Sequence, residues 1–271
     1  MPRTNGSITK KDLLLFYVID VSGSMDGTKI TVVNRSMEDN VKLLREIADE
    51  HPELNVKIAV LTFANRAEWR TSTGPVSVKK FFWKSITETG GGTVFSGFIE
   101  ELDQRLHRTD FLKSEFGCYD PVIIFISDGA PTDADWQKLL SEKCENNAHL
   151  KNAKKIAIAI DDGDEVNSGS MREALRELVG SDSAVIEATS HEELKKKIIA
   201  VSASSLAITV QTHLLYNTGN ADDIIKNAGN IPDEYFEKIM ERKAKPRTAD
   251  QRQPNVGDWV GDWNDKEWEN A

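Results

Sequence analysis

The chain has few cysteines and no long apolar segment. Its only two cysteines, Cys118 and Cys144, lie far apart and form no CxxC pair, which excludes a disulfide framework and a cysteine-based zinc site. The longest strongly apolar run, Leu13–Ile19, is much shorter than the roughly 20 residues of a membrane span. The polar N-terminus lacks the apolar segment of a secretory signal, so we expect a cytoplasmic protein without a membrane partner.

Positive charge is also scarce, since 34 basic residues stand against 44 acidic ones and give a net charge of −10. Nucleic acids and anionic membranes would repel such a chain, so we expect neither as a partner. The sequence contains no P-loop and no GxSxG nucleophile motif, and its five histidines are scattered. We therefore expect that the protein is not an enzyme.

The 271 residues do contain a regular alternation of two kinds of segment. Continuous apolar runs, typical of strands buried on both faces, occur at 13–19, 56–63, 122–126, 156–160 and, more weakly, 184–186. Between them, apolar residues three or four positions apart predict amphipathic helices, the first capped by Asp26 and the third by Thr132 or Asp133. This alternation indicates a Rossmann-like, doubly wound α/β fold with a six-stranded, mainly parallel sheet and helices on both faces. Residues 67–70, after a tight turn, predict one antiparallel edge strand.

The alternating pattern covers residues 10–206, which we interpret as one domain. Residues 207–271 form a C-terminal extension in which the pattern fades. A short helix is predicted over 231–240, and the polar stretch 243–256 with its two prolines is typical of a linker. The extension ends in an acidic, tryptophan-rich tail.

Polar residues follow the predicted strands at the positions where parallel sheets bind their ligands. The first strand ends in Asp20 and is followed by Ser22 and Ser24; a later strand ends at Asp128, and three glycines precede Thr93. Two carboxylates and three hydroxyls are hard oxygen ligands, which suit Mg²⁺ or Mn²⁺ better than zinc. Magnesium takes only one or two protein carboxylates, so this set leaves a position open for a carboxylate from another molecule. These five residues are therefore the candidate metal ligands.

The segments Ile19–Met25 (IDVSGSM), Gly91–Thr93 and Phe125–Asp133 (FISDGAPTD) resemble, in order and spacing, the metal-ion-dependent adhesion site of von Willebrand factor A (VWA) domains. The resemblance covers about residues 10–206 and is greatest to the stand-alone bacterial VWA proteins of the TerY, or tellurite-resistance, type. It implies a doubly wound fold, a bound divalent cation, and a protein partner whose acidic side chain completes the coordination. It also implies a place in a bacterial stress-response or signalling assembly, often beside a kinase and a phosphatase.

Three other interpretations of the site stay open. Hydroxyl residues such as Ser22, Ser24 and Thr93 also cap helices, and Asp128 is a residue type that caps turns. A bound metal can serve only to hold the loops together. A metal-dependent hydrolase is the third interpretation, although we find no paired base that would act with a metal-bound water.

The C-terminal tail carries three tryptophans in an acidic segment that cannot form a core of its own. Tryptophan is typical of binding hot spots, so we interpret Trp259, Trp263 and Trp268 as partner-binding residues. The alternatives are packing onto the chain's own domain and a disordered segment with no role. A further hypothesis is that Asp258 or Asp262 fills the open metal position in the resting protein. The main alternative function is a regulatory subunit that contacts an associated kinase, phosphatase or ATPase through this tail.

Overall fold

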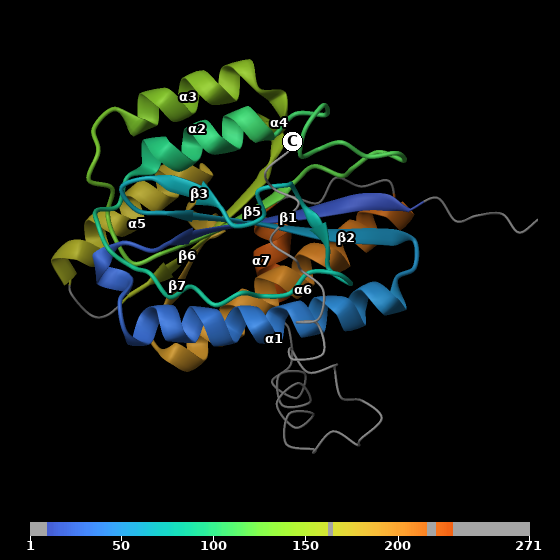
Figure 1. Cartoon of the computed structure of the whole chain (residues 1–271), viewed down its shortest axis with the longest axis horizontal. Helices are drawn as coiled ribbons and strands as arrows, with labels where there is room; N and C mark the ends of the chain where they lie inside the picture. The colour runs from blue at the N-terminus through green and yellow to red at the C-terminus, as the bar shows by residue number, and fades with distance from the viewer. Residues whose placement is uncertain (1–9, 162–164, 216–220, 230–271) are drawn as a thin grey trace, which may run out of the picture. The chain divides into compact units, whose positions relative to one another are not determined.

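The computed structural model describes residues 10–161, 165–215 and 221–229. Figure 1 shows them as a central sheet with helices on both faces. The strands are β1 (Lys11–Asp20), β2 (Leu54–Phe63), β3 (Ala67–Trp69), β4 (Val76–Ser77), β5 (Val122–Ser127), β6 (Lys154–Ile160) and β7 (Val185–Ala188). The helices are α1 (Thr28–Glu50), α2 (Phe95–Arg105), α3 (Trp136–Asn146), α4 (Ala148–Asn152), α5 (Glu165–Val179), α6 (His191–Leu215) and α7 (Ala221–Gly229), with short 3₁₀ helices η1 (Gly23–Met25) and η2 (Asp182–Ala184).

The sheet has the strand order β3-β2-β1-β5-β6-β7. Neighbouring strands from β2 to β7 along this order are parallel, and β3 runs antiparallel to β2 at one edge. The doubly wound, mainly parallel α/β fold predicted from the sequence is confirmed. The two-residue β4, which pairs antiparallel with β2, adds a seventh strand to the six predicted. Two residues are too few to show the apolar run or alternation by which a strand is recognised in a sequence.

The winding of the sheet reverses at β1. The chain passes from β1 through α1 to β2 on one side, whereas β5 lies on the other side of β1. The carboxyl ends of β1 and β5 therefore lie next to each other at the reversal point, which is where open α/β sheets bind their ligands. Asp20 is the last residue of β1, and Ser127 is the last residue of β5.

β1 is apolar along most of its length because both of its faces are covered. Leu15 and Tyr17 pack in the layer formed with α1 and α6, whereas Phe16 and Val18 pack in the layer formed with α2 and α5. All four side chains are fully buried. Figure 1 shows α1 and α6 on one face of the sheet and α2 and α3 on the other. Burial on both faces fixes β1, and with it the position of the residues that follow its carboxyl end.

The N-cap predicted for the first helix is wrong. α1 begins at Thr28, and the residue before it is Gly27, whose φ of 76° lies in the left-handed region that favours glycine. Asp26 lies one residue too early to cap this helix. Its carboxylate instead accepts a hydrogen bond from Thr89 Oγ1 at 2.9 Å. This bond ties the loop after β1 to the segment that precedes α2.

Residue 206, where the alternating sequence pattern ends, lies inside α6, and α7 packs against this helix. None of the helices within the three described ranges is both long and apolar enough to cross a membrane. The helix predicted over 231–240, the linker and the tail with Trp259, Trp263 and Trp268 lie outside the described residues.

Candidate metal site

Three loops meet at the carboxyl ends of β1 and β5. They are the β1–α1 loop (21–27), the glycine loop (90–94) and the β5–α3 loop (128–135). Four of the five predicted ligands lie in these loops, and Asp20 directly precedes the first of them. The three loops come from distant parts of the sequence, so the contacts between them decide whether the predicted residues form one site.

Backbone hydrogen bonds join the three loops directly. Gly23 N in the β1–α1 loop donates to the carbonyl of Gly91 in the glycine loop at 3.1 Å. Thr132 N in the β5–α3 loop donates to the carbonyl of Thr93 at 2.8 Å. The glycine loop is therefore held from both sides, and the five predicted residues are brought to one place in the fold. Their assignment as metal ligands stays a prediction.

Asp20 lies at the base of the site and is fully buried. Its Oδ1 accepts a hydrogen bond from the backbone N of Ser22 at 2.8 Å, and its Oδ2 accepts one from Ser127 Oγ at 2.6 Å. Burial raises the pKa of this carboxyl from 3.8 to about 6, against the lowering effect of both hydrogen bonds, and the nearby Asp128 raises it further. The protein thus keeps a carboxylate in a place where its negative charge is poorly solvated. A bound cation would stabilise this charge.

A chain of hydroxyls leads from the β1–α1 loop to Asp128. Ser22 Oγ and Ser24 Oγ lie 3.1 Å apart, and Ser24 Oγ donates to Asp128 Oδ1 at 2.7 Å. The other oxygen, Oδ2, accepts a hydrogen bond from Lys29 Nζ at 2.6 Å. The Asp128 side chain is completely buried in this ion pair, and that of Lys29 is 18% exposed. Lys29 is not among the residues predicted for the site, because a lysine in the first turn of a helix shows no local sign of a contact 99 positions away.

Thr93 is almost fully buried between the glycine loop and the β5–α3 loop. Its Oγ1 lies so close to Gly129 that a Cβ added there would be 2.9 Å from it. Its carbonyl accepts hydrogen bonds from the backbone N of Thr132 at 2.8 Å and from Thr132 Oγ1 at 3.1 Å. Gly129, directly after Asp128, therefore lets the hydroxyl of Thr93 approach the end of β5.

The shape of the glycine loop depends on Asn65, which follows β2. Asn65 Oδ1 accepts a hydrogen bond from Gly92 N at 2.7 Å. Gly91 has a φ of 82°, and a Cβ at this position would lie 2.7 Å from the Asn65 amide. Gly91 is thus required both by its backbone conformation and by the close approach of Asn65. The sequence pattern predicts a tight turn before residues 67–70 but not this contact.

Asp133 caps α2, not α3 as predicted. α3 begins at Trp136. The two carboxylate oxygens of Asp133 accept hydrogen bonds from the backbone N of Phe95 at 2.9 Å and of Ser96 at 2.8 Å, in the first turn of α2. The helix receives its cap from a loop far along the sequence because its own N-cap position is a valine, which has no acceptor. This contact also fixes the chain just after Thr93.

The donors at the site fit a hard divalent cation. Two buried carboxylates and three hydroxyls lie together, and both burial and the nearby Asp128 disfavour the charged form of Asp20. In the described part of the chain, no cluster of three or more histidine, cysteine, aspartate or glutamate residues offers a different kind of metal site. Oxygen donors of this type suit Mg²⁺, Mn²⁺ or a similar cation better than a metal that prefers sulfur or nitrogen.

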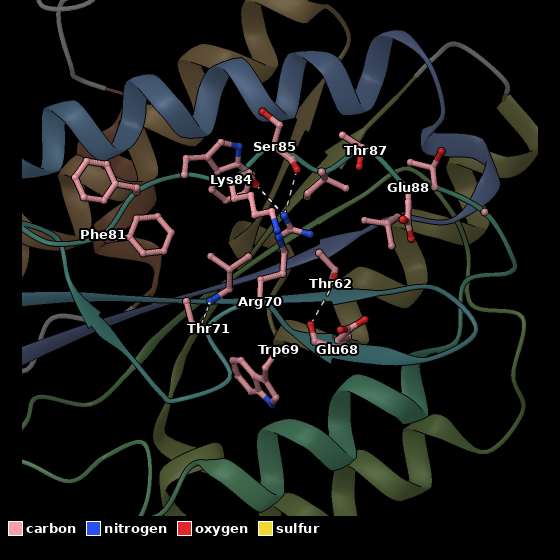
Figure 2. A pocket seen from close by; sticks show the side chains of 17 residues that line it. Thr62, Glu68, Trp69, Arg70, Thr71, Phe81, Lys84, Ser85, Thr87 and Glu88 are labelled. Atoms are coloured by element: carbon pink, nitrogen blue, oxygen red, sulfur yellow. Dashed lines mark hydrogen bonds between the residues drawn. The ribbon is translucent and has the colours of Figure 1, made fainter. Parts of the chain in front are cut away.

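A hollow of about 700 Å³ lies at the β3 edge of the sheet, next to the glycine loop (Figure 2). Arg70, at the end of β3, donates to the carbonyls of Lys84 at 2.9 Å and Ser85 at 3.2 Å across it. The guanidinium thus holds the segment that leads into the glycine loop. The charged lining residues are Glu68, Glu88, Arg70 and Lys84, so the hollow has no net charge that would select an ionic ligand.

No protein-family model and no curated protein matches the sequence. Solved structures do match the fold. The pilus adhesin SpaC of Lactobacillus rhamnosus GG, in its open conformation, has a TM-score of 0.53 at 14% identity over 80% of this chain and 30% of that one. A mutant of the PilB minor pilin of Streptococcus sanguinis has a TM-score of 0.57 at 12% identity over 80% of this chain and 66% of that one.

A structure of proximal thread matrix protein 1 from the mussel byssus, described as having a zinc-occupied adhesion-site (MIDAS) motif, has a TM-score of 0.48 at 18% identity. It is matched over 74% of this chain and 47% of its own length, so the chain spans about half of that protein. With the strand order, the matches to the two pilus proteins show the doubly wound α/β fold that is implied by the resemblance to VWA domains. The likeness is one of fold alone.

Proposed function

We propose that the protein is a metal-dependent protein-interaction module of the VWA type and that its cation is Mg²⁺ or Mn²⁺. The observation that carries this proposal is the pair of buried carboxylates, Asp20 and Asp128, joined through serine hydroxyls at the reversal point of the sheet. Asp20, Ser22, Ser24, Thr93 and Asp128 would hold the cation. When bound, the metal supplies a positive centre that an acidic side chain of the partner can ligate.

The exposure of the site supports recognition of another protein. The two carboxylates are buried, whereas Ser24 and Gly91 at the rim are exposed, so a ligand can approach from one side. The chain has a net charge of −10, which opposes the approach of an acidic partner. A cation at the rim would reverse this repulsion locally, and partner binding would then depend on the metal.

We propose a non-enzymatic role for this site in a cytoplasmic bacterial stress-response or signalling assembly, in line with the resemblance to TerY-type proteins. The residues that form the site are acids, hydroxyls and Lys29, and neither a histidine nor a cysteine is among them. Metal-dependent turnover of a generic phosphoester by the purified protein would contradict this part of the proposal and favour a hydrolase.

Metal binding is tested first, by calorimetric titration of Mg²⁺ and Mn²⁺ into the full chain. Asp128→Ala is expected to abolish binding because it removes a buried carboxylate of the site. Asp110→Ala is the matched control, since Asp110 forms an exposed ion pair with Arg105 outside the site. Equal affinity in the wild type and Asp128→Ala would refute the site assignment.

Partner binding is tested next, with immobilised wild type and Asp128→Ala, each in Mg²⁺ and in EDTA. A partner retained only by the wild type in Mg²⁺ is expected. Changing acidic residues of that purified partner to amides, one at a time, should identify the carboxylate that completes the coordination. Retention under all four conditions would move the interface away from the metal site.

A regulatory subunit of an associated kinase, phosphatase or ATPase is the alternative, with the tail tryptophans Trp259, Trp263 and Trp268 as the contact. It rests on the sequence of the tail, which lies outside the described residues. Deletion of residues 256–271 would abolish partner binding in this case, and Asp20→Ala would leave it intact. The adhesion-type interaction predicts the opposite pair of results.

A further inference from the structure

Lys29 brings a fixed positive charge into the proposed metal site. Its ammonium lies 2.6 Å from Asp128 Oδ2, and the carboxylate it neutralises is completely buried. Asp128 shares its other oxygen with Ser24, so one carboxylate connects the lysine to the predicted ligands. An ammonium group only donates hydrogen bonds, and it cannot itself ligate a metal.

The location of Lys29 in its helix is electrostatically unfavourable. Lys29 is the second residue of α1, where the helix dipole favours anions and disfavours cations. The first turn of α1 contains no acidic residue. The ion pair with Asp128 offsets this cost, which indicates that the charge is positioned for Asp128 and not for the helix.

The lysine is attached to a well-fixed start of the helix. Gly27, with its positive φ, sets where α1 begins, and its carbonyl accepts hydrogen bonds from Thr31 N at 3.3 Å and Thr31 Oγ1 at 2.7 Å. The preceding residue, Asp26, is held by Thr89. The ammonium is therefore presented to Asp128 from a helix start that several hydrogen bonds hold in place.

We propose that Lys29 is a tethered counter-cation that competes with the divalent metal for Asp128. This inference rests on the proposed function, because it assumes that Asp128 belongs to a metal site. In the absence of metal, the ammonium neutralises Asp128 and keeps the three loops assembled. Entry of a divalent cation displaces the ammonium from Asp128, so Lys29 lowers the metal affinity of the site.

The first test is Lys29→Met, which keeps most of the side chain's length but removes its charge. Mn²⁺ affinity of the full-length chain is measured by titration followed by electron paramagnetic resonance. We expect Lys29→Met to bind Mn²⁺ about tenfold more tightly, an effect of the size that a neighbouring charge has on the proton affinity of a carboxylate. Lys57→Met is the matched control, because Lys57 Nζ pairs with the nearly buried Asp12 at 2.7 Å near the start of β1, away from the site.

The second test uses the unaltered protein and so decides the question even if Lys29→Met does not fold. Acylation of each lysine by N-hydroxysuccinimidyl acetate is followed by mass spectrometry, with and without saturating Mn²⁺. We expect Mn²⁺ to accelerate acylation of Lys29, because the displaced ammonium leaves its ion pair, and to leave Lys57 unchanged.

The outcomes separate this inference from the proposed function. Tighter binding by Lys29→Met together with faster acylation of Lys29 supports the competition. Equal or weaker binding by Lys29→Met, or an unchanged acylation rate, overturns it while the metal site itself stands. Absence of Mn²⁺ binding by both the wild type and Lys29→Met overturns both proposals.

Discussion

Replacement of Asp20 by asparagine should stabilise the metal-free protein while it destroys the metal site. Asp20 is buried with a negative charge that the surroundings solvate poorly, as its raised pKa of about 6 shows. Asparagine has nearly the same shape and no charge. The side-chain carbonyl of the asparagine can accept the hydrogen bond from Ser22 N. Its amide NH₂ can donate to Ser127 Oγ, which in the wild type is itself the donor to Asp20.

The size of the effect follows from the difference between the folded and the ordinary pKa. An increase from 3.8 to about 6 means that ionised Asp20 lowers the free energy of unfolding by about 3 kcal/mol at neutral pH. Between pH 3.8 and about pH 6 the folded state binds more protons than the unfolded state, because Asp20 is protonated only in the folded state. Stability therefore decreases as the pH rises from about 4 to about 6 and stays low above that. After allowance for the altered hydrogen bond to Ser127, we expect Asp20→Asn to raise the free energy of unfolding by about 1–2 kcal/mol at pH 8 and by much less at pH 4.5.

The assay is urea unfolding of the wild type and Asp20→Asn in EDTA at several pH values. Other carboxyl groups titrate in both proteins, so the difference between the two curves isolates Asp20. Addition of Mg²⁺ at 100 times its dissociation constant should then stabilise the wild type by about 2.7 kcal/mol and leave the variant unchanged. A difference between the two proteins that is independent of pH, or a variant less stable at pH 8, would refute the reasoning.

Three further predictions concern the framework of the site. Gly91→Ala should lower the free energy of unfolding by about 1–3 kcal/mol and weaken Mn²⁺ binding, because its φ is positive and a Cβ would meet Asn65; urea unfolding and titration check this. Asp133→Ala should cost about 1–2 kcal/mol, seen in urea unfolding, since it removes the acceptors for the first turn of α2. Tyr17 should titrate near pH 12 by its absorbance, since burial raises its pKa to about 12, and Tyr17→Phe should cost about 1–3 kcal/mol because Asn40 loses its buried acceptor.

The features that the sequence predicted well depend on local patterns. The apolar run that became β1 is visible because a strand buried on both faces has no polar alternation. The grouping of Asp20 with Asp128 follows from the rule that parallel strands bring their carboxyl ends to one edge of the sheet. Neither inference requires knowledge of side-chain contacts. The positions of Ser22 and Ser24 after Asp20 further predict that hydroxyl oxygens join the carboxylates as candidate ligands.

The contacts that the sequence could not reveal are those between loops. Local spacing predicts that Thr132 or Asp133 caps the nearest downstream helix, because a sequence shows only local caps. Asp133 instead accepts a hydrogen bond from Phe95 N, 38 positions earlier. Lys29 donates a hydrogen bond to Asp128, 99 positions later, and Asn65 accepts one from Gly92, 27 positions later. Such side chains have ordinary local surroundings, and only the tertiary fold gives them a role.

The fading of the pattern near residue 206 has a physical cause in α6 itself. Over residues 198–206 this helix is buried between the sheet, α1 and α7, so this stretch lacks the one-sided apolar stripe by which a surface helix is recognised. Three of its buried hydroxyls, those of Ser202, Ser205 and Thr209, donate to the carbonyls four residues earlier at 2.7 Å. Ser202 also meets the buried Tyr17 hydroxyl at 2.8 Å. Polar residues in this buried stretch therefore weaken the apolar pattern of the sequence at a place where α6 continues.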